Sequence, residues 1–329
     1  MLPLAISLGD PSGIGPETVA RAWERRDTER LQPFFAVGDA RSIEAVWQGP
    51  IACISGPDEA LAAFADALPI IQVEDAGDIA PGEPNVAGAR CALDALELAV
   101  GLARSGATAA IVTGPVAKAR LYEIGFTHPG QTEFVAERCG VSRANVAMML
   151  AGPTLRTVPI TMHMPLREAI DLLSVDLILA RARTVERGLI RDFGIERPRL
   201  AVAGLNPHAG EGGALGREEI EIVAPAIERL REEGMEVIGP LSPDTMFHER
   251  GRAAYDVALC LYHDQALIPL KTLHFDSGVN VTLGLPIVRA APDHGTAFDI
   301  AGKGIADPGA MIAAIRMAGE CAEHRARAS

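Results

Sequence analysis

Short apolar runs alternate along the chain with longer stretches of helical periodicity. The short runs, each of which predicts a β-strand, lie at residues 4–8, 34–37, 51–54, 109–112, 145–150, 155–161, 199–205 and 256–262. Helical patterns cover residues 15–25, 88–104, 175–191 and 217–233. This alternation predicts an α/β protein with mostly parallel sheets. Gly152-Pro153 separates two neighbouring runs, so those two strands are expected to form an antiparallel hairpin.

Three histidines each follow one of the predicted strands: His163, His208 and His263. In open α/β sheets, ligands bind at the carboxyl ends of the strands. A lone histidine in such a place is usually structural, but three with matching placement favour a divalent-metal site with room for a substrate. Asp264 directly follows His263 and is suited either to orient an imidazole or to bind metal itself.

The composition agrees with this fold class. With 329 residues, the chain is long enough for about two domains. It is 48% hydrophobic but only 4% aromatic, so Ala, Val, Leu and Ile must fill the core, as is usual in parallel sheets buried on both faces. The net charge of −13 argues against a nucleic-acid partner, and an anionic substrate would need a local cationic pocket.

The cysteines and the start of the chain indicate its setting. Five cysteines are widely scattered, and no pair has the spacing of a metal or redox motif. An odd number of separated thiols fits a reducing compartment. No basic region precedes the first apolar stretch, and no run approaches the roughly 18 apolar residues of a membrane span. We therefore expect a cytoplasmic protein without a membrane partner.

Candidate anion-binding side chains cluster after His263. They are Lys271, Asn280 and Arg289. A lysine and an arginine near a metal are suited to hold the phosphate and carboxylate of a substrate. Arg289 ends the apolar run 283–288, so we expect it at the end of another strand.

Four glycine-containing segments allow either a structural or a functional interpretation. Segment 9–17 is not a complete dinucleotide fingerprint, because Thr18 replaces the third glycine, and a tight strand-to-helix turn explains it equally well. Segment 113–118 favours a plain helix start over an anion site. Segment 206–213 suggests close backbone approach to a ligand, and segment 293–304 is a loop that could wrap a nucleotide.

The longer motifs resemble those of known enzyme families. Gly9-Asp10 followed by Gly13-Ile14-Gly15-Pro16-Glu17 resembles the opening of the metal-dependent β-decarboxylating dehydrogenases, which include isocitrate and isopropylmalate dehydrogenase. His294-Gly295-Thr296-Ala297 with residues 299–304 resembles their adenosine-binding loop. Those enzymes hold their metal with aspartates. The histidine contexts instead resemble a sister branch, the 4-hydroxythreonine-4-phosphate dehydrogenase family of vitamin B6 biosynthesis. The resemblance covers essentially the whole chain and includes segments 161–166, 206–213, 262–265 and 278–286.

The resemblance implies a fold and a division into domains. We expect two α/β/α domains with mostly parallel sheets, isocitrate/isopropylmalate dehydrogenase-like, with the active site in the interdomain cleft. Residues 1–130 with 285–329 would form a cofactor-associated domain, and residues 131–284 a domain for metal, substrate and dimerisation. The matched ends, 9–17 and 294–304, are expected to pack together in one domain.

The resemblance also implies the site residues. The protein would be a homodimer whose metal is held by His163 and His208 of one subunit and His263 of the other. The implied substrate contacts are Gln131, Thr132, Lys271, Asn280 and Arg289, and the implied cofactor contacts are His294, Gly295 and Thr296. Gln131 replaces the histidine usual in the family; it can donate a hydrogen bond to phosphate but carries no charge. Lys271, Asp244 and metal-bound water are the open candidates for the general base.

The implied reaction is the NAD- or NADP-dependent oxidation of 4-phosphooxy-L-threonine to 2-amino-3-oxo-4-phosphooxybutanoate. This product would decarboxylate to 3-amino-2-oxopropyl phosphate, the substrate of pyridoxine 5'-phosphate synthase. One divalent metal per site, zinc, cobalt or magnesium, would act as a Lewis acid. Within the same family, the alternatives are dehydrogenases of erythronate or threonate phosphates and of aromatic cis-dihydrodiols, although cis-dihydrodiols have no phosphate for the cations to bind. Outside it, the alternatives are a phosphotransacetylase, which needs no metal, and a zinc hydrolase, which needs no nucleotide loop.

Overall fold

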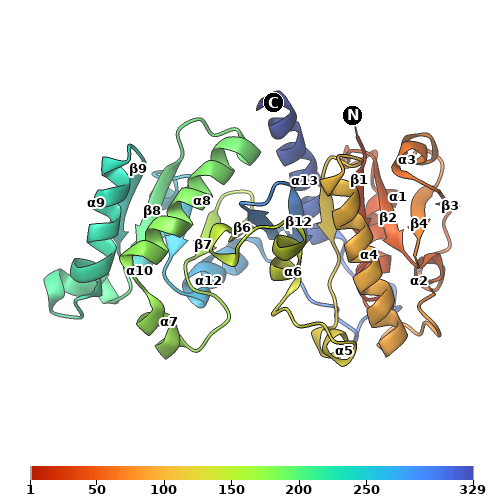
Figure 1. Cartoon of the computed structure of the whole chain (residues 1–329), viewed down its shortest axis with the longest axis horizontal. Helices are drawn as coiled ribbons and strands as arrows, with labels where there is room; N and C mark the ends of the chain where they lie inside the picture. Colours follow the sequence, from red (N-terminus) through yellow and green to blue (C-terminus); the bar gives the residue numbers. More distant parts are fainter. Residues whose placement is uncertain (1, 74, 329) are drawn as a thin grey trace. The chain divides into compact units, whose positions relative to one another are not determined.

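The computed structural model describes residues 2–73 and 75–328, which form two compact units (Figure 1). Unit 1 consists of Met1–Gly140 and Leu285–Ala326, and unit 2 is built on Val141–Gly284. The sequence placed the first boundary at residue 130. Unit 1 continues to residue 140 because helix α6 (Gln131–Arg138) packs in it through Phe134, whose ring centroid lies 5.6 Å from that of Phe126.

Unit 1 contains a parallel sheet with the strand order β3-β4-β2-β1-β5-β12. Its strands are β1 (Leu4–Ser7), β2 (Phe34–Gly38), β3 (Ile51–Cys53), β4 (Leu68–Gln72), β5 (Ile111–Thr113) and β12 (Arg289–Pro292). Its helices are α1 (Gly15–Glu24), α2 (Ala40–Glu44), α3 (Pro57–Ala63), α4 (Val86–Arg104), α5 (Lys118–Glu123), α6, and α13 (Gly309–Ala328). The two central strands β1 and β2 are buried along their whole length, which is why their sequences are continuous apolar runs.

Unit 2 contains a mixed sheet with the strand order β11-β6-β7-β10-β8-β9. Its strands are β6 (Ala147–Ala151), β7 (Arg156–Pro159), β8 (Arg199–Ala203), β9 (Glu236–Leu241), β10 (Val257–Cys260) and β11 (Val279–Leu283). Its α-helices are α7 (Leu166–Leu172), α8 (Val175–Phe193), α9 (Ala224–Glu232), α10 (Pro243–Met246), α11 (Glu249–Arg252) and α12 (His263–His274). Shorter turns are Arg143–Asn145, Pro207–Gly213 and the π-helical turn Glu219–Val223.

The expected hairpin is confirmed. Strands β6 and β7 pair antiparallel, with Leu150 opposite Thr157, and the turn closes through a 2.9 Å hydrogen bond from the Gly152 N–H to the Leu155 carbonyl. Strand β11 pairs antiparallel with β6 on its other side. The remaining pairs of this sheet are parallel, so the mostly parallel α/β fold predicted from the sequence is confirmed.

Local signals explain where the long helices begin and end. In α8, the Ser174 side chain accepts from the Leu177 N–H at the start, and Gly194 ends the helix with a left-handed φ of 64°. The predicted helix at 217–233 is interrupted. Pro225 has no N–H to donate to residue 221, and the chain forms the π-helical turn Glu219–Val223 before α9 begins.

Two predictions about the strands were incomplete. The apolar pattern predicted no strand at β4, β9 or β11, and Arg289 was expected at the end of a strand. Arg289 instead begins β12, and residues 284–288 form a loop after β11. Strand β12 has the sequence Arg-Ala-Ala-Pro, in which a charge, two small residues and a proline hide the usual strand signal.

Candidate active site

The three histidines follow three neighbouring strands of unit 2. In the sheet, β10 lies between β7 and β8 and pairs in parallel with both. His163 follows β7, His208 follows β8, and His263 begins α12 directly after β10. Because parallel strands end at one edge of a sheet, the predicted placement of all three at the same edge is confirmed.

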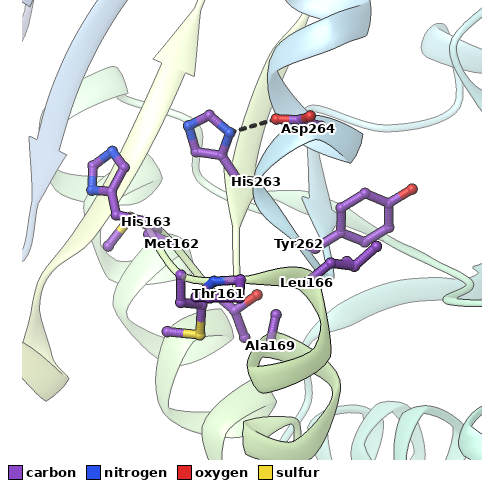
Figure 2. A pocket seen from close by; sticks show the side chains of 10 residues that line it. Thr161, Met162, His163, Leu166, Ala169, Tyr262, His263 and Asp264 are labelled. Atoms are coloured by element: carbon purple, nitrogen blue, oxygen red, sulfur yellow. Dashed lines mark hydrogen bonds and ion pairs between the residues drawn. The ribbon is translucent and has the colours of Figure 1, made fainter.

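His163 and His263 line one pocket of about 470 Å³ (Figure 2). Their ring centroids are 5.5 Å apart and the ring planes make an angle of 47°. The pocket is lined by Thr161, Met162, His163, Met164, Pro165, Leu166, Ala169, Tyr262, His263 and Asp264. Its polar lining residues are the two histidines, Asp264, Thr161 and Tyr262, and the other lining residues are apolar.

Asp264 orients the His263 ring. Its Oδ1 lies 2.7 Å from His263 Nδ1, the contact drawn as a dashed line in Figure 2. An ionised carboxylate only accepts hydrogen bonds, so Nδ1 is the donor and Nε2 keeps its lone pair. Metal-ligating histidines in proteins are commonly held this way. An imidazole nitrogen of this kind is a ligand that zinc or cobalt accepts.

His208 lies in the turn Pro207–Gly213, where its backbone φ is 52° and its side chain is exposed. Among the described residues of this single chain, no group of three or more His, Cys, Asp or Glu side chains is placed to hold a metal ion. The structure therefore brings two histidines into one pocket and the third to the same sheet edge. The sharing of a site between subunits stays a prediction.

Arg289 is a buried cation in unit 1. Its side chain is only 4% exposed, and its guanidinium donates to Thr113 Oγ1 at 2.7 and 3.2 Å and to Thr132 Oγ1 at 3.2 Å. Burial lowers the pKa of Arg289 to about 10, while nearby Glu133 acts in the opposite direction. Arg289 therefore remains charged at neutral pH and is held in one orientation by two threonine hydroxyls.

Gln131, the first residue of α6, is also anchored. Its Nε2 donates to the Gly114 carbonyl at 2.9 Å, while its buried Oε1 has no described hydrogen-bond partner. One amide N–H is thus occupied by the backbone. The structure places Gln131 and Thr132 at the same helix start, and Thr132 contacts Arg289.

The other predicted substrate and catalytic residues lie in unit 2. Lys271 is on α12, with its Nζ 5.9 Å from the centroid of the Phe275 ring. Asn280 is on β11, and its Oδ1 is buried without a described partner. Asp244 is exposed on α10 and accepts a 2.6 Å hydrogen bond from Ser242. The predicted substrate residues are thus divided between the two units.

The predicted cofactor segment packs on the first strand-to-helix turn of unit 1. The Ile14 N–H donates to the Thr296 carbonyl at 3.0 Å, and the Ala306 N–H donates to Glu17 Oε1 at 3.3 Å. The expectation that the two matched ends of the chain pack together is confirmed. His294 Nδ1 lies 3.0 Å from the carbonyl oxygen of Gly295. A Cβ added to Gly295 would have open space around it.

The glycines of segment 9–17 have a structural explanation. Gly9 has a φ of 76°, and a Cβ there would lie 2.2 Å from the Pro115 carbonyl oxygen. A Cβ on Gly15 would lie 2.0 Å from the Leu8 carbonyl oxygen. Only glycine permits these backbone approaches, so the tight-turn interpretation accounts for both residues.

Sequence reasoning did not single out two residues that hold predicted site residues in place. Thr113 was noted only as part of a turn, although it accepts twice from Arg289. Glu219 lay within a helical pattern, yet its carboxylate accepts from the backbone before His208. Both contacts join residues far apart in the sequence, and no local pattern signals them.

No α-helix among residues 2–73 and 75–328 is both long enough and apolar enough to span a bilayer. None of the five cysteines, all of which lie among the described residues, forms a disulfide bond.

Comparison with known proteins identifies the family. The model of the family described as pyridoxal phosphate biosynthetic protein PdxA matches residues 30–318. A 4-hydroxythreonine-4-phosphate dehydrogenase from Zymomonas mobilis is 56% identical over 99% of this chain and 97% of its own length. The crystal structure of that enzyme from Klebsiella pneumoniae has a TM-score of 0.88 and 38% identity, covering 98% of this chain and 100% of its own.

A more distant structure is a terephthalate 1,2-cis-dihydrodiol dehydrogenase from Burkholderia xenovorans. It is 30% identical with a TM-score of 0.65, and the match covers 96% of this chain and 97% of that one. The family model and the full-length relatives agree with the resemblance of the histidine motifs. The chain belongs to the PdxA family of pyridoxal phosphate biosynthetic proteins.

Proposed function

We propose that this chain is a 4-hydroxythreonine-4-phosphate dehydrogenase. It would oxidise 4-phosphooxy-L-threonine with NAD or NADP to 2-amino-3-oxo-4-phosphooxybutanoate, which loses CO₂ to give 3-amino-2-oxopropyl phosphate for a pyridoxine 5'-phosphate synthase. The observation that carries this proposal is the placement of His163, His208 and His263 after three neighbouring parallel strands. The name of the 56% identical relative supplies the substrate.

The histidines would hold one divalent cation, zinc, cobalt or magnesium. When bound, the cation supplies Lewis-acid stabilisation for negative charge on the oxygen of the substrate hydroxyl. Asp264 keeps the His263 Nε2 lone pair available by accepting from Nδ1. We further propose a homodimer in which His263 completes the site of the neighbouring subunit.

Arg289 would bind an anionic group of the substrate. The guanidinium is already desolvated and fixed by Thr113 and Thr132, so little side-chain freedom is lost when the substrate binds. Lys271 and Asn280 from unit 2 would complete the contacts to the substrate. Arg289 and Lys271 would supply the local positive charge that an anionic substrate needs in a chain of net charge −13.

The chemistry assigns a base and a hydride acceptor. A base, Lys271 or Asp244, would take the proton of the substrate hydroxyl. Hydride would pass from the carbon that bears this hydroxyl to the nicotinamide. The β-keto acid then loses CO₂, and the electrons of the broken C–C bond move toward the new carbonyl. The segment with His294, Gly295 and Thr296 would bind the adenosine part of the cofactor and keep the nicotinamide in reach.

The test is formation of reduced nicotinamide, followed by absorbance, with a panel of phosphorylated hydroxy acids. The panel contains 4-phosphooxy-L-threonine, erythronate 4-phosphate and threonate 4-phosphate, each with NAD and NADP and with zinc, cobalt or magnesium. We expect 4-phosphooxy-L-threonine to give the highest kcat/KM and EDTA to abolish turnover. Higher kcat/KM for another acid would reassign the substrate, and unchanged activity in EDTA would contradict the metal role.

A substitution of one histidine tests the same proposal. His208→Ala should abolish turnover while leaving the thermal unfolding midpoint close to that of the wild type, because the side chain is exposed. His324→Ala serves as a matched control, since His324 lies on α13 of unit 1, far along the chain from the three strand ends. The role of His208 as a metal ligand would be refuted if the His208→Ala variant, stripped of metal by a chelator and then supplied with metal again, had full activity.

A further inference from the structure

The turn that carries His208 has an unusual backbone. Residues 208–212 all have positive φ, between 44° and 81°, and three of them, His208, Ala209 and Glu211, are not glycine. A run of left-handed residues is sterically disfavoured for L-amino acids. Such a conformation persists only where its surroundings impose it.

The carboxylate of Glu219 contacts the residues that lead into this turn. Glu219 Oε1 accepts from the backbone N–H groups of Leu205 and Asn206 at 2.8 and 2.7 Å. Glu219 Oε2 accepts from Asn206 Nδ2 at 2.9 Å. The side chain of Glu219 is only 3% exposed, so these hydrogen bonds are shielded from water.

The same carboxylate also packs against glycines on both sides of His208. A Cβ on Gly204 would lie 3.3 Å from Glu219 Oε1, and a Cβ on Gly210 would lie 2.6 Å from Glu219 Oε2. The π-helical turn that begins at Glu219 sets the position of this side chain. The carboxylate of Glu219 therefore lies against the chain both before and after His208.

We propose that Glu219 is a positioning residue that holds the turn Pro207–Gly213 in its left-handed form and so fixes where His208 presents its imidazole. The inference rests on the proposed function, because the group that His208 would meet is the divalent metal. The Glu219→Gln variant replaces one carboxylate oxygen with an NH₂ group, which can only donate. That group must face other donors, either the backbone N–H groups of Leu205 and Asn206 or Asn206 Nδ2. Rotation of the Asn206 amide cannot repair this, because its Nδ2 also donates to Glu218 Oε2 at 2.7 Å.

The test compares Glu219→Gln with Glu221→Gln as a matched control. Glu221 lies in the same π-helical turn, but it is exposed and pairs with Arg217. Co²⁺ is titrated into each purified metal-free protein and followed by its visible absorbance. Hydrogen exchange of the metal-free proteins is measured over residues 205–213.

We expect Glu219→Gln to weaken Co²⁺ binding about 10- to 100-fold and to speed exchange of the Leu205 and Asn206 amides, with Glu221→Gln unchanged in both. Co²⁺ affinity of Glu219→Gln within twofold of the wild type would overturn the proposal. If Glu219→Gln does not fold, Asn206→Ala replaces it, because this variant removes one donor and leaves the carboxylate in place; unchanged Co²⁺ affinity there would likewise overturn it.

The two proposals fail in distinguishable ways. Wild-type protein that does not bind Co²⁺ would contradict the proposed function, and the exchange measurement would then decide alone whether Glu219 holds the turn. Wild-type binding with an unaffected Glu219→Gln would overturn only the positioning role. A double variant with His208→Ala adds a further check: if Glu219 acts through His208, Glu219→Gln should weaken Co²⁺ binding no further in that background.

Discussion

Two threonine hydroxyl groups accept hydrogen bonds from the buried guanidinium of Arg289. Thr113 Oγ1 accepts from its Nε and Nη2, and Thr132 Oγ1 accepts from its Nη1. A hydroxyl carries no net charge, so these hydrogen bonds orient the guanidinium without neutralising it. A carboxylate in the place of Thr113 would neutralise it. The choice of threonine is therefore what makes this buried arginine suitable for binding.

Thr113→Val tests that role. The change keeps the shape but removes the acceptor of two hydrogen bonds from a charged group, each worth about 1.5–3 kcal/mol. We expect KM for the phosphorylated substrate to rise about tenfold with a smaller change in kcat. Thr108→Val is the control, because Thr108 is buried and its hydroxyl has no described partner. An equal rise in KM for both variants would show that general packing, not the arginine, is responsible.

Gln131 provides a second prediction at the scale of one residue. Gln131→His introduces a group with an ordinary pKa near 6.5, which adds a positive charge as the pH falls. We therefore expect the KM of the variant to decrease from pH 8 to pH 6 relative to the KM of the wild type. Steady-state kinetics over this range provide the measurement. Parallel pH profiles would mean that residue 131 does not face an anionic group of the substrate.

Helix α2 depends on one carboxylate at its start. Asp39 caps it by accepting from the Arg41 N–H at 3.0 Å, and it also accepts from the Ala76 N–H at 3.0 Å. Burial raises the pKa of Asp39, but the hydrogen bonds, chiefly from the Arg41 side chain, outweigh burial and lower the pKa to about 2. A lowered folded-state pKa means that this stabilisation is present above pH 3.8 and is lost as the pH falls through 2.

Asp39→Asn should accordingly lower the free energy of unfolding by about 1 kcal/mol at pH 7. The difference from the wild type should shrink below pH 3.8 and vanish near pH 2. Thermal unfolding of both proteins across this range measures it. Asp66→Asn, at an exposed carboxylate, is the control and should show no such trend. A difference that is independent of pH would contradict the electrostatic explanation.

The elements that could be predicted from sequence are those whose burial is uniform along their length. Strands β1, β2 and β10 are buried at every residue, so an apolar run marks each of them. Strand β9 has a single buried residue, Val237, and contains Pro240, and β12 begins with Arg289, so neither resembles an apolar run. The three histidines follow β7, β8 and β10, and only the first residue of β7 and of β8 is not buried, so these strands also read as apolar runs.

Contacts between distant segments set the limits of sequence reasoning about the site. That His163 and His263 share a pocket follows from the order of strands β7 and β10 in the sheet, which only the fold determines. The contact of Thr113 with Arg289 spans 176 positions in the sequence. Residue types and motifs thus predicted the kind of chemistry and the family, while the residues that hold the site in place emerged from the structure.

Unit 1 is built from two segments of the chain, and the sequence of unit 2 separates them. In the sequence, the residues of unit 2 come between β5 and β12. In the sheet of unit 1, however, these two strands pair in parallel, with Arg289 opposite Ile111. A fragment of residues 141–284 contains every strand of its own sheet. A fragment of residues 1–140 lacks both β12 and the Thr296 carbonyl that accepts from Ile14.

We expect the two fragments to behave differently. Residues 141–284 should unfold cooperatively on heating, as followed by circular dichroism. Residues 1–140 should show weak near-ultraviolet signal and no sharp transition, because their sheet and first turn are incomplete. A cooperative transition of the shorter N-terminal fragment would show that β12 contributes little to the stability of unit 1.

The interruption of unit 1 by unit 2 has a consequence during synthesis. The ribosome makes the first 140 residues before any of unit 2, yet β12 leaves the exit tunnel only after unit 2 is complete. The nascent chain must therefore carry the N-terminal half, with the exposed edge of β5 and an unfilled turn at Ile14, while the middle of the protein folds. Exposed strand edges recruit other chains, so this half is where a holding chaperone would be needed first.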